Sequence, residues 1–310
     1  MTGGRARTVF IGSGGFGRPS LRLLASHDDV DLVGVVTASP RPAGRHGRPT
    51  PTAIHDAAMD AGVPVIQTPE RLRAPEAIDE LLELRPDLIV LADYGQIIPA
   101  PLLEAGRGAL NLHPSLLPRH RGATPIPAAI LAGDTETGVT LMRMDEGLDT
   151  GPVVAQTVVP LGIGEIAPEL EARLAEVAAD LLGEHVGPWL RGEIEPRPQS
   201  VEGVTMTRPL RREDGRLDVS RPAAELERQV RAYQPWPGAF VETPLGRLIV
   251  WSAEPASGGQ PSGTFDLEGI GVGDRGRLRL IDVQPAGGKR MSWAAYVRGR
   301  PAIIGASIVG

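Results

Sequence analysis

Three polar residues have the types and spacing needed for transfer of an acyl-type group to an amine. Asn111 and His113 flank one leucine at the end of a short apolar run, and Asp149 follows later in a loop that contains Gly147 and Gly151. Such chemistry requires a donor for the developing oxyanion, an acid or base near neutrality, and a carboxylate that orients the imidazole. We therefore take Asn111, His113 and Asp149 as candidate catalytic residues.

Local patterns predict how these side chains meet. Residues 109–113 alternate as a strand, which places Asn111 and His113 on one face, and Pro114 ends the strand. Ligands bind at the carboxyl ends of strands in open α/β sheets. Residues 139–144 form a second alternating strand, and the turn that follows it is expected to deliver Asp149.

Composition excludes several other chemistries. The chain contains no cysteine, so it has no disulfide, thiolate nucleophile or zinc–sulfur site. No serine stands in a recognisable nucleophile elbow, which favours direct transfer over a covalent intermediate. The cluster has no second histidine at ligand spacing, and we expect no metal.

Strands and helices alternate in the first part of the chain. This alternation with short connections predicts a Rossmann-like, doubly wound, mostly parallel sheet. A long helix over residues 166–185 is expected to close the domain, and the polar, proline-containing segment that follows is typical of a linker. The predicted strands are 8–11, 32–36, 64–66, 88–91 and 153–158, and the predicted helices include 53–61, 75–84 and one from Thr124 or Pro125 to Gly133.

The last third of the chain has a different pattern. A helix over residues 221–232 precedes short strands separated by glycine and proline turns, which predicts a second, smaller β-barrel domain. These strands are 238–241, 247–251, 263–266, 269–272 and 277–283. We place the domains at 1–187 and 205–310, with a linker over 188–204.

The length and charge limit the class of protein. The 310 residues suffice for two domains, and no apolar run approaches the roughly 18 residues of a membrane span. No signal peptide precedes the first strand, so we expect a cytoplasmic enzyme. The net charge is −6, yet the part from Arg208 onward carries 15 Arg and Lys against 11 Asp and Glu, a net +4. This distribution is compatible with contact between that part and a polyanion.

A glycine-rich turn at residues 12–17 follows the first strand and fits the pattern of a dinucleotide site. However, the strand 32–36 ends without an Asp or Glu that would hold a ribose. Arg41 could bind the 2′-phosphate of NADP, so the sequence does not exclude an NADP site. Glycines also permit close packing between a strand and a helix, and we favour this interpretation.

Five ordered segments resemble the folate-dependent formyltransferases. They are Asn111-x-His113, the Ser-Leu-Leu-Pro segment 115–118, 122–126, 138–140 and 145–151. The resemblance implies a Rossmann-like fold, 10-formyltetrahydrofolate as co-substrate, and neither metal nor NAD(P). It also implies that Asn111 donates to the oxyanion, His113 handles a proton, and Asp149 favours the charged imidazole or positions a water. The folate pocket is then expected to include Tyr94, Ile97, Ser115, Leu116, Leu117 and Pro118.

Other segments, at 41–45, 94–99, 233–237 and 284–289, are similar to the branch of this family that acts on initiator methionyl-tRNA. This similarity implies formylation of the methionine α-amine, an OB-like second domain that binds tRNA, and a monomer. His120 replaces a tryptophan that is common in the family, and the loop after Arg45 is less basic than usual. The implied tRNA contacts are Arg41, Arg45, Arg48, Arg119, Arg121, Lys289 and Arg290.

Three alternatives remain open from the sequence. A formyltransferase for a glycinamide nucleotide or an amino sugar would share the three catalytic residues, although the basic second domain and the segment around Trp236 favour tRNA. An NADP-linked oxidoreductase would leave the Asn111, His113 and Asp149 cluster unexplained. A non-catalytic tRNA-binding relative would not need all three reactive residues.

Overall fold

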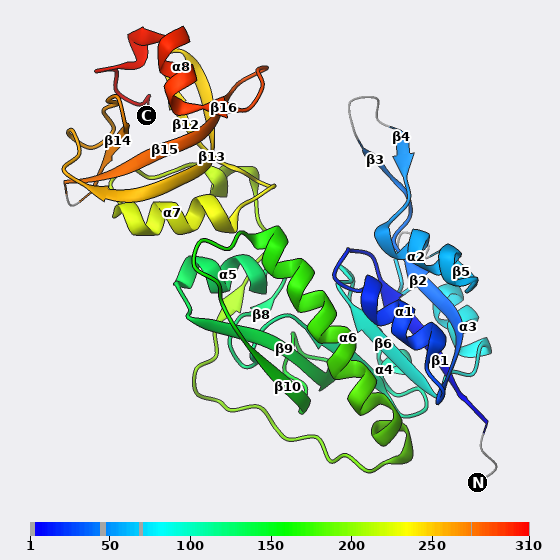
Figure 1. Cartoon of the computed structure of the whole chain (residues 1–310). Helices are drawn as coiled ribbons and strands as arrows, with labels where there is room; N and C mark the ends of the chain where they lie inside the picture. The colour runs from blue at the N-terminus through cyan, green and yellow to red at the C-terminus, as the bar shows by residue number, and fades with distance from the viewer. Residues whose placement is uncertain (1–3, 44–47, 68–70, 274, 310) are drawn as a thin grey trace. The chain divides into compact units, whose positions relative to one another are not determined.

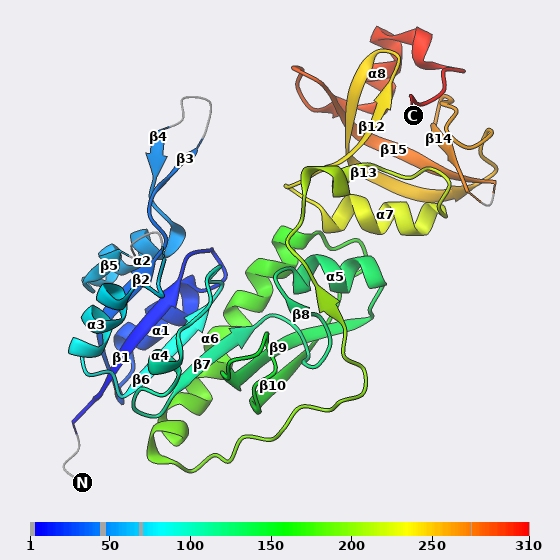
Figure 2. The same cartoon turned by 180° about the vertical axis from the view of Figure 1, so that it is seen from behind.

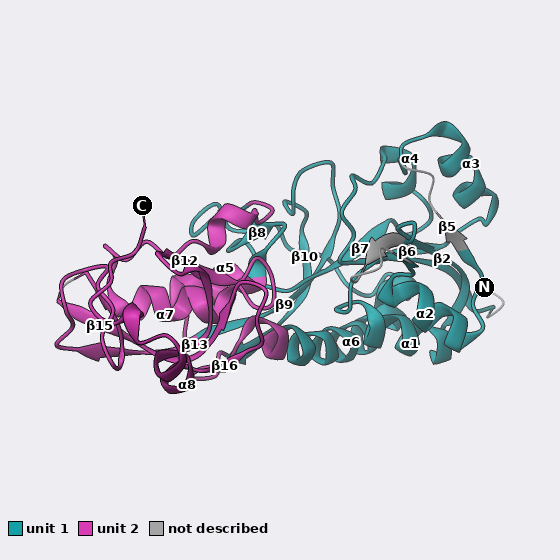
Figure 3. Ribbon diagram, turned by 90° about the horizontal axis from the view of Figure 1, so that it is seen from above, with its two compact units in different colours: residues 1–125, 136–160, 171–207 teal, residues 126–135, 161–170, 208–310 magenta. Residues whose placement is uncertain are grey.

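The computed structural model describes residues 4–43, 48–67, 71–273 and 275–309. The chain divides into two compact units, which are coloured separately in Figure 3. Each unit contains its own sheet. The first comprises Met1–Pro125, Glu136–Pro160 and Glu171–Thr207, and the second comprises Ile126–Thr135, Leu161–Leu170 and Arg208–Gly310.

The first unit contains a seven-stranded sheet with the order β10-β9-β7-β6-β1-β2-β5. The strands β1, β2, β5, β6 and β7 run parallel, whereas β9 is antiparallel to both of its neighbours. The predicted doubly wound, mostly parallel sheet is therefore confirmed. The strands are β1 (Ala6–Gly12), β2 (Val30–Thr37), β5 (Val65–Gln67), β6 (Leu88–Ala92), β7 (Ala109–His113), β9 (Glu136–Arg143) and β10 (Val153–Pro160).

Helices cover both faces of this sheet. Figures 1 and 3 show α1 (Arg18–Ser26), α2 (Ala53–Ala61) and α6 (Ala167–Arg191) on one face, and α3 (Pro75–Glu83) and α4 (Ala100–Leu103) on the other. Side chains of a strand alternate between faces, so Val9 and Ile11 pack in one buried cluster with Leu81 of α3 and Leu102 of α4. From Thr8 to Gly12, strand β1 is thus buried between two layers of helices.

The boundaries of α2 match the prediction because both ends carry strong local signals. The Thr52 side chain accepts a hydrogen bond from the His55 backbone N–H and caps the start of the helix. Gly62 adopts a left-handed conformation with φ of 69° and ends the helix. These signals are local in the sequence, which is why the residue pattern was sufficient.

Close packing accounts for the glycine turn after β1. A Cβ atom on Gly12 would lie 2.5 Å from the Ala92 carbonyl oxygen at the end of β6. A Cβ atom on Gly14 would lie 1.5 Å from the Asp93 carboxylate. Larger residues would therefore collide with β6 and the loop after it, so the packing interpretation explains these glycines.

Two predictions about the first unit were wrong. Helix α6 extends to Arg191 and contains Pro188, which we had assigned to the linker. Proline removes the backbone donor that would bond to the carbonyl of Glu184 four residues earlier, and the helix continues from Pro188 to Arg191. The segment around Arg45, which we treated as a loop and left out of the predicted strands, contains β3 (Arg41–Ala43), which pairs with β4 (Arg48–Thr50). Both views in Figures 1 and 2 show this hairpin extending away from the seven-stranded sheet.

The second unit contains an antiparallel sheet with the order β12-β13-β15-β14, and β16 pairs with β15. Its buried core includes Leu226 of α7, Leu248, Leu278 and Trp293. Residues 263–266, which we predicted to form a strand, make only isolated bridges. The elements are α7 (Ala223–Ala232), β12 (Ala239–Thr243), β13 (Gly246–Ser257), β14 (Gly269–Val272), β15 (Gly276–Pro285), β16 (Met291–Ser292) and α8 (Trp293–Gly299), with 3-10 helices Arg212–Gly215 and Pro301–Ile303.

The segment 216–222 connects the two edges of this sheet. The Leu217 N–H donates to the Phe240 carbonyl oxygen on β12 at 2.9 Å, and the Gly273 N–H donates to the Val219 carbonyl oxygen at 3.0 Å. Bridges at Arg216 and Phe240, and at Pro222 and Gly273, accompany these bonds. The segment therefore satisfies backbone groups at both edges, as barrel closure requires. The predicted barrel-like second unit is confirmed in this form.

The helices give no sign of a membrane span. In the described part of the chain, none combines the length and the apolar composition that crossing a bilayer requires. The longest, α6, carries an acidic residue in its first turn and an arginine in its last.

Barrel closure depends on a glycine at position 273. A Cβ atom there would lie 2.0 Å from the Ser220 carbonyl oxygen, so Gly273→Ala must displace the closing segment. We expect a loss of about 1–3 kcal/mol in the free energy of unfolding. Urea unfolding followed by tryptophan fluorescence would measure it, because three of the four tryptophans follow Arg208. Gly299→Ala is the control, since its Cβ atom would meet nothing within 4 Å, and a similar loss in both variants would contradict the prediction.

Candidate active site

The site forms at the carboxyl edge of the parallel strands. Strand β7 lies between β6 and β9, and Ala92 at the end of β6 is in register with Leu112. The loops that follow β6 and β7 therefore emerge at the same edge. On the other side, Asn111 pairs with Met142 of β9 and His113 pairs with Thr140. Asn111 and His113 share one face of β7, as the alternation predicts.

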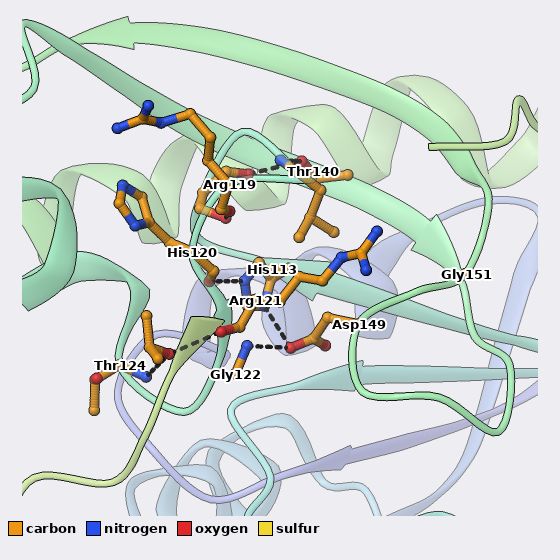
Figure 4. A network of polar contacts seen from close by, with 12 residues as sticks. His113, Arg119, His120, Arg121, Gly122, Thr124, Thr140, Asp149 and Gly151 are labelled. Carbon is orange, nitrogen blue, oxygen red and sulfur yellow. Dashed lines mark hydrogen bonds and ion pairs between the residues drawn. The ribbon is translucent and has the colours of Figure 1, made fainter. Parts of the chain in front are cut away.

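A backbone carbonyl fixes the imidazole of His113. The side chain is buried, with 5% of its surface exposed, and Nε2 lies 2.9 Å from the His120 carbonyl oxygen. A carbonyl only accepts hydrogen bonds, so Nε2 carries the hydrogen. In the neutral ring, Nδ1 is then the unprotonated nitrogen. Figure 4 shows the ring between His120 and Asp149, with Nδ1 3.7 Å from the Asp149 carboxylate.

Burial and charge have opposite effects on His113. Burial lowers the pKa of the imidazole and is the larger effect, while the Asp149 carboxylate and the hydrogen bond to His120 raise it. The net pKa is below the ordinary value of 6.5. We expected Asp149 to favour the charged form, and its field does act in that direction, but burial outweighs it. His113 is therefore neutral near pH 7 and offers Nδ1 as a base.

The backbone of Asp149 has an unusual conformation. Its φ angle is 52°, in the left-handed region, and its side chain is mostly buried. One carboxylate oxygen accepts a hydrogen bond from the Gly122 N–H at 2.7 Å. The same oxygen is the one near His113 Nδ1, at a distance too long for a hydrogen bond. Asp149 thus acts on the imidazole through its field.

The carboxamide of Asn111 is available for a ligand. The residue is partly exposed at the edge of the sheet. Within the described residues, its side chain makes no hydrogen bond. A carboxamide with free N–H donors beside a neutral imidazole is suited to stabilise an oxyanion.

The loop after β7 is anchored on the neighbouring strands. Ser115 is fully buried and donates to the Arg119 carbonyl oxygen at 2.7 Å, and Thr140 donates to the Ser115 carbonyl oxygen at 2.7 Å. Gln156 of β10 donates to the Leu117 carbonyl oxygen at 2.9 Å. Ser115 and Leu117 therefore shape this loop from the inside. Their hydroxyl and apolar side chains are directed into the protein's own packing.

The remaining predicted folate residues are more accessible. Ile97 is 82% exposed, an unusual state for a large apolar side chain, and Tyr94, Leu116 and Pro118 are partly exposed. All of them lie in the two loops at the carboxyl edge of β6 and β7. Such apolar surface fits a flat pterin ring. Their assignment to a folate pocket stays a prediction.

The predicted tRNA-binding residues have different surroundings. Arg119, Lys289 and Arg290 are all exposed, and the Arg290 guanidinium binds Asp282 at 2.8 Å. Arg121 donates to the Gln199 side chain at 2.7 and 3.1 Å. Arg45 lies outside the described residues, and of Arg41 and Arg48 the structure describes only the strand pairing.

Sequence reasoning missed the return of the segment before the second unit. Here β8 (Arg121–Gly122) pairs with β11 (Met206–Thr207). The Thr205 hydroxyl accepts the His120 N–H at 2.7 Å, and Gln199 donates to the loop that carries Asp149. We had placed Gln199 in the linker, because polar residues among prolines are typical of one. No local signal distinguished it.

The described residues include no group of three or more His, Asp and Glu side chains that could hold a metal ion. The nearest acidic partner of His113 is Asp149 alone. An imidazole, a carboxylate and a carboxamide at one edge of a sheet are groups that can support acid–base and oxyanion chemistry.

Models of known families match both parts of the chain. Residues 6–186 match the formyl transferase family, and residues 209–301 match the formyl transferase C-terminal domain. Together with the Rossmann-like sheet and the site at its carboxyl edge, these matches define a formyl transferase.

Curated relatives show which formyl transferases this chain resembles. The methionyl-tRNA formyltransferase of Chloroflexus aurantiacus is 44% identical over 308 residues, which cover 94% of this chain and 96% of the relative. That of Myxococcus xanthus is 42% identical and covers 95% of each chain. The chain belongs to the methionyl-tRNA formyltransferase family.

Solved structures share the fold at low identity. HypX from Aquifex aeolicus in complex with tetrahydrofolic acid has a TM-score of 0.62 and 20% identity, and the match covers 95% of this chain and 47% of that one. An N-formyltransferase from Helicobacter canadensis, with folinic acid and dTDP-3-aminofucose, has a TM-score of 0.64 and 17% identity, covering 89% and 98%. At this identity the likeness concerns the fold.

Nuclear magnetic resonance can test the state of His113. Because burial lowers its pKa, we expect the imidazole to titrate below about 6.5, assigned by the loss of its signal in His113→Gln. Asp149→Asn removes the main opposing charge and should move the midpoint lower still. A midpoint above 6.5, or an upward shift in Asp149→Asn, would show that the electrostatic account is wrong.

Proposed function

We propose that this enzyme transfers the formyl group of 10-formyltetrahydrofolate to the α-amine of methionine on initiator methionyl-tRNA. The observation that carries the proposal is the similarity of nearly the whole chain to enzymes named methionyl-tRNA formyltransferase, at 42–44% identity. The site geometry agrees with it, since a neutral buried imidazole and a free carboxamide share one face of β7.

His113 is the group that handles the proton. An attacking amine must lose a proton as its new bond to the formyl carbon forms, and a neutral imidazole can take it. The imidazolium can then return this proton to N10 of the folate as the bond between the formyl carbon and N10 breaks, so that tetrahydrofolate leaves as a neutral amine. Nε2 is engaged with the His120 carbonyl oxygen, so Nδ1 is the accepting atom. The imidazolium that forms would face the Asp149 carboxylate, which stabilises the positive charge. This positioned base contributes on the order of 10² to 10⁴ in rate.

Asn111 stabilises the negative charge on the formyl oxygen. Its carboxamide is free of hydrogen bonds to described residues and lies two positions before His113 on the same strand face. A preorganised donor of this kind is worth roughly 2.7–4 kcal/mol in the transition state. Asn111 thus stabilises the oxyanion, His113 transfers the proton, and Asp149 stabilises the charge on the imidazolium.

The folate donor fits the accessible residues of the two edge loops. Bound 10-formyltetrahydrofolate supplies the formyl group that the amine receives. Ile97, Leu116 and Pro118 offer apolar surface for its ring, and Tyr94 lies in the same edge loop as Ile97. Ser115 and Leu117 support this surface by holding the loop in shape.

Binding of tRNA is assigned to the basic parts of the chain. The residues from Arg208 onward carry a net charge of +4, and Lys289 is exposed there. The β3–β4 hairpin brings further arginines on an extension from the first unit. We assign Arg41, Arg45, Arg48, Arg119 and Lys289 to phosphate contacts, with Arg121 and Arg290 in supporting positions. The enzyme acts as a monomer in the cytoplasm, where initiator tRNA is charged.

An amino sugar is the second candidate for the acceptor. The Helicobacter canadensis structure shares the fold and its title names dTDP-3-aminofucose. That protein is only 17% identical, whereas the relatives that act on methionyl-tRNA exceed 40%. The identity of the acceptor therefore decides between the two functions.

Transfer of radiolabelled formyl tests the proposal directly. Purified methionyl initiator tRNA, a dTDP-amino sugar and glycinamide ribonucleotide would be offered as acceptors. We expect label on the tRNA, with at least a 10²-fold lower kcat in His113→Ala and Asn111→Ala because each removes a transition-state interaction. Label on a small amine but not on tRNA would assign the site to the other substrate class.

Arg45 should affect binding of tRNA and leave the chemistry intact. Each lost phosphate contact weakens binding and reduces its salt dependence. We expect Arg45→Ala to raise KM for methionyl-tRNA about tenfold, with kcat changed little and the salt slope reduced by about one. Arg22→Ala, at an exposed position on α1, is the control. Equal KM in Arg45→Ala and wild type at physiological salt would contradict this assignment.

A further inference from the structure

The loop that carries Asp149 is held in a conformation that it would not adopt alone. A non-glycine residue with φ of 52° costs free energy of order 1–3 kcal/mol and persists only where surrounding contacts fix it. The Gly122 N–H fixes the carboxylate of Asp149. It does not fix the backbone on either side of the strained residue, so other contacts must do so.

The side chain of Gln199 supplies those contacts. Its Nε2 atom donates to the Asp149 carbonyl oxygen at 2.8 Å and to the Gly151 carbonyl oxygen at 2.8 Å. Two carbonyl groups of one tight loop are therefore tied to a single amide nitrogen. Gly151 packs closely on the end of β9, since a Cβ atom there would lie 1.9 Å from the Arg143 carbonyl oxygen.

The opposite end of the same amide is also fixed. Gln199 Oε1 accepts from the Arg121 Nε and Nη2 atoms at 3.1 and 2.7 Å. A guanidinium only donates and a carbonyl only accepts, so the amide can satisfy both sides in one orientation alone. Arg121 is adjacent to Gly122, the residue that binds the Asp149 carboxylate. Gln199 therefore links the two segments that together position Asp149.

We propose that Gln199 is a positioning residue for the reaction, which sets the Asp149 carboxylate at its distance from His113. The 3.7 Å separation between His113 Nδ1 and the carboxylate is maintained by no direct hydrogen bond, so it depends on the backbone of the loop. A shift of the loop by about 1 Å changes the field at the imidazole and can cost about 10²-fold in rate. This assignment rests on the proposed role of Asp149.

Gln199→Met is the substitution that separates this role from simple stability. Methionine has a similar length and no donor, and the side chain lies in the wall of an open cavity of about 430 Å³ that can accommodate it. We expect kcat to fall about 10- to 100-fold with KM for both substrates nearly unchanged. We also expect the His113 titration midpoint to fall toward the value in Asp149→Asn. A merely structural residue would change the unfolding midpoint but not that titration.

Matched variants make the outcome decisive. Gln260→Met introduces the same change at an exposed glutamine of the second unit, and should leave kcat and the His113 titration as in wild type. If Gln199→Met does not fold, Gln199→Asn keeps the amide but shortens its reach, and should give a smaller loss of kcat in the same direction.

Wild-type kcat and an unshifted His113 titration in Gln199→Met would overturn the proposal. The titration also separates this failure from failure of the proposed function. A different acceptor in wild type would leave the His113 shift in Gln199→Met in place. If Asp149→Asn itself left the His113 midpoint unchanged, Asp149 and His113 would not be coupled. The positioning role proposed for Gln199 would then be wrong as well.

Discussion

The hydrogen bond between His113 Nε2 and the His120 carbonyl oxygen is the interaction on which the site depends. It decides which imidazole nitrogen is protonated, and therefore which atom can accept a proton. It also requires the chain to return to His113 only seven residues later, which the loop achieves with His120 itself in a left-handed conformation, φ of 57°. The hydroxyl of Thr205 accepts the N–H of the same residue and keeps this turn in place. The tautomer of His113, the proposed base, is thus set by backbone geometry.

The parts that support the site come from distant points in the chain. Strands β9 and β10 hold the loop after β7 through Thr140 and Gln156. The segment with Gln199 and Thr205 returns along β8 after the long helix α6 and holds the other side. The proposed catalytic groups lie on one short strand end and one tight loop, and they therefore depend on contacts that span more than eighty positions in sequence. The segment with Gln199 and Thr205 resembles a linker in composition, but its side chains hold the two loops of the site.

The sequence was sufficient wherever a signal is local. Apolar alternation located β7, and Thr52 and Gly62 marked both ends of α2. Asn111, His113 and Asp149 were chosen by type and spacing; the structure brings His113 and Asp149 to 3.7 Å from each other, and their catalytic roles stay predictions. It failed where tertiary contacts decide the outcome. Residues 263–266 have a strand-like composition, but their neighbours leave them only isolated bridges. Gln199 is polar and lies among prolines, and only the folded chain shows that it binds two carbonyl groups of the Asp149 loop.

Burial of the His113 imidazole favours its neutral form and destabilises its charged form. Burial makes protonation less favourable, which keeps His113 available as a base near neutral pH. In the proposed reaction, the same burial would make the imidazolium of His113 too unstable without a compensating charge, and the Asp149 carboxylate at 3.7 Å would supply that charge. A direct hydrogen bond would stabilise the charged form already in the free enzyme, so a smaller fraction of His113 would be neutral and able to accept a proton. The longer distance leaves the base neutral at rest and still stabilises the charge when it develops, so the position of the Asp149 loop sets the balance between the two states.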